Sequence, residues 1–339
     1  MKKHIYLILL MIVIPYGLCF VFSLFCDEIK MGQGDKEIGN HLMHKNILME
    51  INGLYKSMDV EEYILGVLPG TIPADYDAEA LKVQAILIRT NVLKEMEEKG
   101  TSDAADLSYD YLTVDERIEL FGEIHYEKYE KQFERAIVDT AGMVLRQEGN
   151  LVMALYHEVS IGKTASAKEI LGEDISYLQS VNSSQDVEAK HYMNIVHYTW
   201  EELQTLMLEI QGKKKEPDGN NKALNGNEVE NQEEKRMDTT NTEVKKIGIK
   251  VEESTENGYV MKVSVEGTIY TGEEIMRGFH LSSTNFYVEE LEDGLRFVCL
   301  GKGGGMGVSQ YGANRMALDG KKAQDIIMYY LKGVSMEKY

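Results

Sequence analysis

Five glycines within a stretch of seven residues constrain the fold of this 339-residue chain more than any other feature of its sequence. The cluster consists of Gly301, Gly303, Gly304, Gly305 and Gly307. It follows an apolar run at 297–300 that is typical of a β-strand. Glycine loses more backbone entropy on folding than any other residue, so such a cluster indicates positive φ angles or a backbone that closely approaches another group.

The cluster does not fit a loop that binds nucleotide phosphates. The G-x-G-x-x-G spacing would require glycine at Met306 or Val308, and G-x-x-x-x-G-K-[ST] is absent. Ser309, Gln310 and Tyr311 follow instead, ahead of an amphipathic helix expected at 313–331. A strand, a glycine loop and a helix, with groups suited to hydrogen bonding and stacking against a sugar between them, predict one wall of a binding site.

Composition excludes several classes of partner and site. The net charge of -20 argues against nucleic acids and anionic membrane surfaces as partners. The 3 cysteines, at 19, 26 and 299, provide neither a disulfide framework nor a C-x-x-C metal site. The length allows one large domain or two small ones.

The N-terminal residues predict a membrane anchor. Residues 5–25 carry no charge, and about 20 apolar residues can span the hydrocarbon core of a bilayer. Two lysines precede this run and two acidic residues follow it, which places the bulk of the chain outside the cytoplasm. A cleaved signal peptide is the alternative, but S-L-F-C at 23–26 is a poor cleavage site. We expect an uncleaved single-pass anchor at 1–26 and a polar stalk at 27–50.

The remaining chain, 51–339, is typical of an α+β fold with mixed helices and mostly antiparallel strands. Helices are expected at 60–68, 78–99 and 116–140, and strands at 247–252, 259–266 and 268–271. Gln84 and Arg89 lie off the centre of the apolar stripe at 78–99, so a solvated face and a binding site are both open for them. Residues 211–246 are polar and lack aromatic side chains, which predicts a disordered insertion.

A second polar loop, 157–164, follows a hairpin expected at 142–156. It carries His157, Ser160, Lys163 and Thr164, and so forms a second candidate wall. An isolated histidine is more often a hydrogen-bonded structural residue than a catalyst, and both roles are open for His157.

Three separated blocks carry recognisable motifs. The first reads V-E-E-Y-I-L-G-V at 60–67, with I-P-A at 72–74 and E-A-L-K-V-Q-A at 79–85. The second runs from Tyr156 to Val181, and the third joins L-S-S-T-N-F at 281–286 to the glycine loop and S-Q-Y-G-A. In this order the blocks resemble the family of stage II sporulation protein D, which includes the amidase-enhancer proteins. The resemblance covers roughly residues 50–335.

This resemblance implies a lytic transglycosylase that cleaves peptidoglycan glycan strands, beside a partner amidase, while the septal wall is remodelled during engulfment. Such cleavage needs a carboxyl group of raised pKa to protonate the leaving oxygen. The family's glutamate corresponds to Thr71 here, and the histidine of its glycine loop corresponds to Gly304. A threonine hydroxyl cannot act as a general acid near neutral pH, so the catalytic acid position is vacant.

We therefore expect a cell-membrane protein whose extracytoplasmic domain binds glycan strands, with catalysis impaired. Two alternatives remain: an active transglycosylase with a relocated acid, Glu62 or Glu158, and a non-enzymatic scaffold or activator of a cell-wall amidase. The expected partners are glycan strands, an amidase and other membrane-bound engulfment proteins, with no nucleic acid. Some relatives bind a metal through histidine and cysteines, but only His157 is present here, so no metal and no cofactor are expected.

The expected glycan-binding residues come from all three blocks, and we expect Thr71, the 157–164 loop and the 301–310 loop to line one cleft. The full set is Gln84, Arg89, His157, Ser160, Lys163, Thr164, Ser283, Asn285, Ser309, Gln310 and Tyr311.

Overall fold

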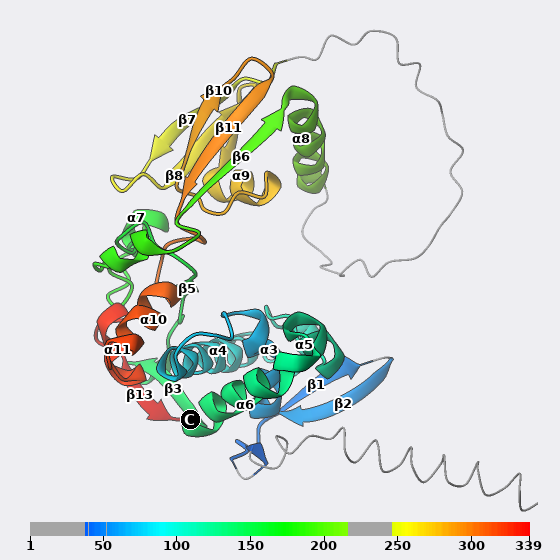
Figure 1. Ribbon diagram of the computed structural model, residues 1–339, viewed down its shortest axis with the longest axis vertical. Coiled ribbons are helices and arrows are strands. Elements are labelled where there is room, and N and C mark those ends of the chain that lie inside the picture. The colour runs from blue at the N-terminus through cyan, green and yellow to red at the C-terminus, as the bar shows by residue number, and fades with distance from the viewer. Residues whose placement is uncertain (1–37, 40, 52, 216–245) are drawn as a thin grey trace, which may run out of the picture. The chain divides into compact units, whose positions relative to one another are not determined.

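The computed structural model describes residues 38–39, 41–51, 53–215 and 246–339 (Figure 1). The chain divides into two compact units. Unit 1 contains the residues up to Leu155 together with Ala313–Tyr339, and unit 2 is Tyr156–Gly312. Each unit has its own core and its own sheets, which are mostly antiparallel.

Unit 1 combines a helical layer with two small sheets (Figure 1). Its helices are α3 (Val60–Val67), η1 (Leu68–Gly70), α4 (Ala78–Lys99), η2 (Ala104–Asp106), α5 (Val114–Phe121), α6 (Glu123–Asp139) and α11 (Ala323–Tyr330). Its strands are β1 (Asn46–Ile51), β2 (Leu54–Asp59), β3 (Met143–Gln147), β4 (Asn150–Leu151) and β13 (Ser335–Lys338). The strand β1 pairs with β2, and the second sheet has the order β13-β3-β4, all antiparallel.

The start of α3 follows from its first residues. The Asp59 carboxylate accepts a hydrogen bond from the backbone N–H of Glu61, and Glu62 accepts one in return from the backbone N–H of Asp59. This capping box satisfies backbone donors that the first helical turn leaves unpaired. The helices expected at 60–68 and 78–99 are confirmed, and Glu62 is held at the end of α3.

A buried ion pair joins α3, α4 and the segment that precedes β3. The Arg89 guanidinium donates to both carboxylate oxygens of Glu61, at 2.7 and 2.9 Å, and to the Met143 carbonyl at 3.2 Å. The backbone N–H of Gly142 donates to the same carboxylate at 2.8 Å. Both charged side chains have 0% exposure. The structure thus places Arg89, expected as a glycan-binding candidate, in the core of unit 1, where its donors are occupied.

Two long helices expected from the sequence are each divided in two. The helix expected at 116–140 is α5 followed by α6, and Gly122 between them has a φ of 73°. The helix expected at 313–331 is α10 (Gln310–Leu318) followed by α11, with Gly320 at a φ of 85° between them. A left-handed backbone ends a right-handed helix, and glycine adopts that conformation without a Cβ clash.

Unit 2 contains three groups of paired strands (Figure 1). Its strands are β5 (Tyr156–His157), β6 (Met193–Thr199), β7 (Ile249–Ser254), β8 (Val260–Val265), β9 (Thr268–Thr271), β10 (Phe286–Glu290), β11 (Gly294–Leu300) and β12 (Val308–Ser309). Its helices are α7 (Ala167–Ile170), η3 (Ser184–Glu188), α8 (Trp200–Lys215) and α9 (Gly272–Gly278), and α10 begins at its end. The sheets β10-β11-β6 and β7-β8-β9 are antiparallel, and the short pair β12-β5 is parallel.

The core of unit 2 lies against one face of the β10-β11-β6 sheet. Phe297 of β11 packs edge-to-face against Phe279 and Phe286, with ring centroids 5.5 and 6.0 Å apart. Trp200 and Leu203 of α8 belong to the same buried cluster. Side chains alternate between the two faces of a strand, so the residues next to Phe297 in sequence point to the other, open face of this sheet.

The expected fold class requires one correction, because it included an N-terminal transmembrane helix. Within the part of the chain that the structure describes, none of the helices is both long and apolar enough to cross a membrane. The expected anchor at 1–26 falls outside the described residues, as does 216–245 of the expected insertion. Strand β1 begins at Asn46, inside the expected stalk. The structure supports a mixed α+β fold.

Removing one partner of the Arg89–Glu61 pair should strongly destabilise unit 1. Arg89→Met leaves a buried carboxylate without its cation, which typically costs about 3–5 kcal/mol, and adding Glu61→Leu should recover most of the loss. Urea unfolding followed by far-UV circular dichroism measures the change. Glu98→Gln, which breaks the more exposed Lys94–Glu98 pair on α4, is the matched control and should cost less than about 1 kcal/mol. Equal losses in the two variants would contradict this role for the buried pair.

Candidate functional site

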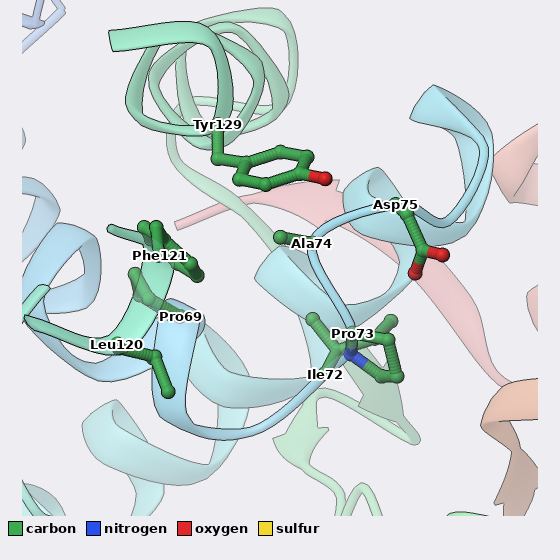
Figure 2. A pocket seen from close by; sticks show the side chains of 8 residues that line it. All are labelled: Pro69, Ile72, Pro73, Ala74, Asp75, Leu120, Phe121 and Tyr129. Carbon is green, nitrogen blue, oxygen red and sulfur yellow. The ribbon is translucent and has the colours of Figure 1, made fainter. Parts of the chain in front are cut away.

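A pocket of about 250 Å³ opens in unit 1 beside the connection between α3 and α4 (Figure 2). Its wall is formed by Pro69, Ile72, Pro73, Ala74, Asp75, Leu120, Phe121 and Tyr129. Figure 2 shows the Tyr129 ring lying over Ala74. Phe121 packs edge-to-face against Tyr129, with centroids 5.3 Å apart. The wall is mainly apolar, with one carboxylate and one phenol hydroxyl, a combination that suits a small ligand with both apolar and polar faces.

Thr71 belongs to the segment that forms one side of this pocket, between Pro69 and Ile72. Its hydroxyl donates to the Leu68 carbonyl at 2.9 Å. The amide nitrogen of Gln84, a buried residue of α4, lies 3.5 Å from the same hydroxyl. The structure therefore brings Thr71 and Gln84 together, whereas Arg89 lies apart from them in the core of unit 1.

In unit 2 a buried carboxylate joins three segments. Asp186, in η3, accepts hydrogen bonds at one carboxylate oxygen from the Ser160 N–H and the Ser309 hydroxyl, both at 2.6 Å. Its other oxygen accepts one from the Ser183 hydroxyl at 3.0 Å. Asp186 has 0% exposure. Because a buried carboxyl group must be hydrogen-bonded to be tolerated, these donors fix the 157–164 loop, η3 and the start of α10 to one another.

His157 lies next to Ser309 in the parallel β5–β12 pair. Its Nδ1 atom is 3.0 Å from the Met306 carbonyl, so Nδ1 carries the proton. Its Nε2 atom is buried and has no hydrogen-bond partner among the described residues. Burial lowers the pKa of His157, an effect that the Met306 carbonyl and the Asp186 charge oppose. The imidazole is consequently neutral at pH 7.

The surroundings of His157 do not fit the histidine–cysteine metal site that the resemblance implies for some relatives. A metal bound at the Nε2 atom would need further ligands around it. No three histidine, cysteine, aspartate or glutamate side chains gather in the described parts of the chain to provide them.

The glycine loop packs tightly on the 157–164 loop. Four of its glycines have positive φ angles, as the sequence predicts, and Gly304 is the exception. A Cβ at Gly301 would be 2.7 Å from the Val159 carbonyl, and one at Gly303 would be 2.9 Å from the His157 Cβ. The close approach expected from the glycines is confirmed, and what they approach is the 157–164 loop of the protein itself. At Gly304 a Cβ would meet nothing within 4 Å.

Most of the expected glycan-binding residues of unit 2 are buried. Their side chains lie inside the unit: His157, Ser160, Thr164, Ser283, Asn285, Ser309 and Gln310. Thr164, for example, accepts a hydrogen bond from the Val181 N–H at 3.0 Å. Lys163 is exposed and Tyr311 is partly exposed. The buried polar groups support the two loops. Fewer of the expected residues are therefore accessible to a ligand than the sequence predicts.

Comparison with known proteins identifies the region that contains Thr71. Residues 51–146 match the sequence profile of the family described as stage II sporulation protein. This part of the chain is therefore similar to the stage II sporulation protein family. The matched region includes Thr71, Gln84 and all the residues that line the pocket.

Three known proteins are similar to this chain over most of its length. Stage II sporulation protein D of Bacillus subtilis is 26% identical over 294 residues, which cover 85% of this chain and 77% of the relative. Stage II sporulation protein D of Bacillus amyloliquefaciens is 25% identical, over 85% of this chain and 76% of the relative. The amidase enhancer of Bacillus subtilis is 22% identical over 81% of this chain and 40% of its own length. The resemblance expected from the three blocks is confirmed.

Two features of the structure were not anticipated from the sequence. Asp186 follows the second block in a polar N-S-S-Q-D run, which is typical of an ordinary loop. Tyr129 and Phe121 lie in a strongly charged segment that indicates only a helix. The expected proximity of Thr71, in unit 1, to the two loops of unit 2 stays a prediction.

The neutral state of His157 predicts how the stability of unit 2 depends on pH. The folded-state pKa is lowered, so the unfolded chain binds a proton first as the pH falls, and stability should decrease once the pH drops below the ordinary value of 6.5. Urea unfolding at about pH 7.5 and about pH 5.5, followed by the fluorescence of the single tryptophan, Trp200, measures this change. His157→Asn, whose amide can still donate to Met306, should weaken the dependence. Identical pH dependence in the two proteins would show that His157 is not its source.

Proposed function

We propose that this chain is a sporulation-associated protein of the bacterial cell wall that binds peptidoglycan glycan strands without cleaving them efficiently. Its similarity to the stage II sporulation protein family, to stage II sporulation protein D and to an amidase enhancer supports a role in sporulation and in the wall. The observation that carries the proposal is the Thr71 hydroxyl, hydrogen-bonded to the Leu68 carbonyl at the position of the family's acid.

The pocket beside Thr71 is the proposed site for a sugar. The Tyr129 and Phe121 rings offer surfaces on which the apolar face of a pyranose can pack, while the Asp75 carboxylate can accept hydrogen bonds from sugar hydroxyls. The Lys128 ammonium lies 5.0 Å from the Tyr129 ring centroid, so a cation adjoins the pocket as well. The Gln84 side-chain amide donates a hydrogen bond to the Thr71 hydroxyl. In unit 2, Lys163 and Tyr311 are the expected glycan-binding residues that reach solvent.

A second candidate function is cleavage with a relocated acid, and one observation favours it. Asp75 is an exposed carboxylate that lines the pocket four residues after Thr71. The two residues expected for this role are otherwise engaged: Glu62 caps α3, and Glu158 forms an ion pair with Lys302. If strands are cleaved, Asp75 is the acid that this geometry provides.

The similarity to the amidase enhancer supports a cell-wall amidase as a partner. This role is compatible with glycan binding, because a protein that holds a strand can present it to an amidase. The two functions can be measured separately, because variants of the pocket beside Thr71 can be assayed for glycan binding and for amidase activation independently.

The vacancy at Thr71 predicts binding without turnover. The purified protein should co-sediment with denuded glycan strands and release no products with anhydro-sugar ends, because loss of a general acid removes on the order of 10²–10⁴-fold in rate. Thr71→Glu combined with Gly304→His should raise cleavage. The structure permits the second change, since Gly304 does not have a positive φ and a Cβ would have open space.

Thr71→Gln combined with Gly304→His is the matched control, with similar side-chain volume and no acid. Mass spectrometry of the soluble products distinguishes the variants. Cleavage by the unmodified protein that is lost in Asp75→Asn would establish the second candidate function. Cleavage that survives Asp75→Asn and Thr71→Ala would contradict both.

The pocket predicts that glycan affinity depends on Tyr129. Tyr129→Leu keeps an apolar side chain but removes the ring, and should weaken binding about threefold to tenfold, the range expected for one aromatic contact. Tyr55→Leu on β2 removes an exposed ring of the same domain away from the pocket and should leave affinity unchanged. Equilibrium binding to strands of defined length measures both. Equal affinity in the two variants, with unfolding curves intact, would place the binding site elsewhere.

A further inference from the structure

A cation lies over the Tyr129 ring in the wall of the unit 1 pocket. The exposed Lys128 side chain places its ammonium group 5.0 Å from the centroid of this ring. An ammonium group above a tyrosine ring is attracted by the negative face of the ring. Because the ring itself lines the pocket, this contact holds a positive charge beside the space that a ligand would occupy.

This ammonium group forms no ion pair with any residue that the structure describes, in contrast to the lysines of α4. All three of those form ion pairs: Lys82 with Asp139, Lys94 with Glu98 and Lys99 with Glu95. Acidic residues outnumber basic ones in this chain, 56 to 36, so carboxylate partners for lysine are abundant. A lysine that lacks one beside a pocket is available to an anionic ligand.

The sequence of α6 keeps carboxylates away from Lys128. Its neighbours on the helix surface, three and four positions before and after it, are Ile124, His125, Lys131 and Gln132. Four glutamates of α6 recur at intervals of three or four and form a separate row on the helix: Glu123, Glu127, Glu130 and Glu134. The positive charge of Lys128 is therefore not neutralised by its neighbours on the helix.

The pocket also offers a negative charge. Asp75 is the one charged residue among those that line it, and it comes from the connection between α3 and α4. A ligand in the pocket therefore meets a carboxylate that accepts hydrogen bonds, an aromatic surface and, beside that surface, a cation. A sugar that carries hydroxyl groups and an anionic substituent matches this set of groups.

The glycan strands proposed for this pocket contain such a sugar at every second position. N-acetylglucosamine is neutral, whereas N-acetylmuramic acid carries a lactyl ether whose carboxyl group is linked to the stem peptide through an amide. Where the peptide has been removed, this group is a carboxylate at neutral pH. An ammonium group can donate up to three hydrogen bonds to it.

We propose that Lys128 is a specificity-determining residue that binds the lactyl carboxylate of peptide-free N-acetylmuramic acid in the pocket beside Thr71. This inference rests on the proposed function. The pyranose packs on the Tyr129 ring while its carboxylate pairs with the ammonium group. Neither N-acetylglucosamine nor an amide-linked lactyl group supplies the anion. The pocket thus selects one of the two alternating sugars and sets which of them lies beside Thr71.

Changing the protein and the strand in turn isolates this contact. The two probes are denuded strands of defined length and the same strands with their lactyl carboxyl groups converted to neutral methylamides. The unmodified full-length protein should bind the carboxylate strands about twofold to fivefold more tightly at low ionic strength, the range of a partly exposed ion pair. Lys128→Met keeps an apolar stem against Tyr129 and should bind both probes with the same, lower affinity.

Lys56→Met on β2 is the matched control, because it removes an exposed positive charge of unit 1 outside the pocket wall. It should retain the full preference for carboxylate strands. That preference should shrink between about 0.05 M and about 0.5 M salt, since salt screens exposed charges.

Two results would overturn the role of Lys128 while leaving the proposed function intact. One is equal affinity of the unmodified protein for both probes, and the other is a preference that Lys128→Met does not remove. In both cases the strands still bind. An unmodified protein that binds neither probe would contradict the proposed function and this inference together.

Discussion

Arg89 and Glu61 are both fully buried, and two opposite charges are tolerated in a protein interior only when their hydrogen-bonding groups are satisfied. The geometry meets this requirement, since the carboxylate also accepts from Gly142 and the guanidinium also donates to Met143. The pair consequently fixes α3 and α4 relative to β3. The connection between α3 and α4 carries Thr71 and half of the pocket wall, so the candidate site depends on this contact.

Unit 2 uses a single buried carboxylate for a comparable purpose. Asp186 holds the 157–164 loop and the start of α10 through one hydrogen bond to each. The glycine loop then packs on the same segment through positions where no Cβ would fit. Most of the polar side chains of these loops therefore serve to hold the loops together. A glycan would contact the few side chains that remain at the surface.

Local signals predicted much of the fold, and long-range contacts explain what they missed. The capping residue Asp59 marks the start of α3, and the periodic apolar positions of 78–99 define α4. Both signals act within a few residues of the chain. Gly122 and Gly320 interrupt expected helices, since periodicity alone does not reveal a positive φ. The sequence analysis did not predict the contact between Thr71 and Gln84, although the two residues are only 13 positions apart. The burial of Arg89 and the role of Asp186 were not predicted either, because their partners lie far away in the chain.

The central claim is that glycan strands bind at the pocket beside Thr71 and remain intact. Hydrogen–deuterium exchange on the full-length protein, with and without denuded glycan strands of defined length, tests it most directly. If strands bind at this pocket, exchange should be slower in segments 69–75 and 120–129 when strands are present, and the strands should be recovered unchanged after the incubation. Protection confined to other segments, or release of shortened strands during the incubation, would contradict it.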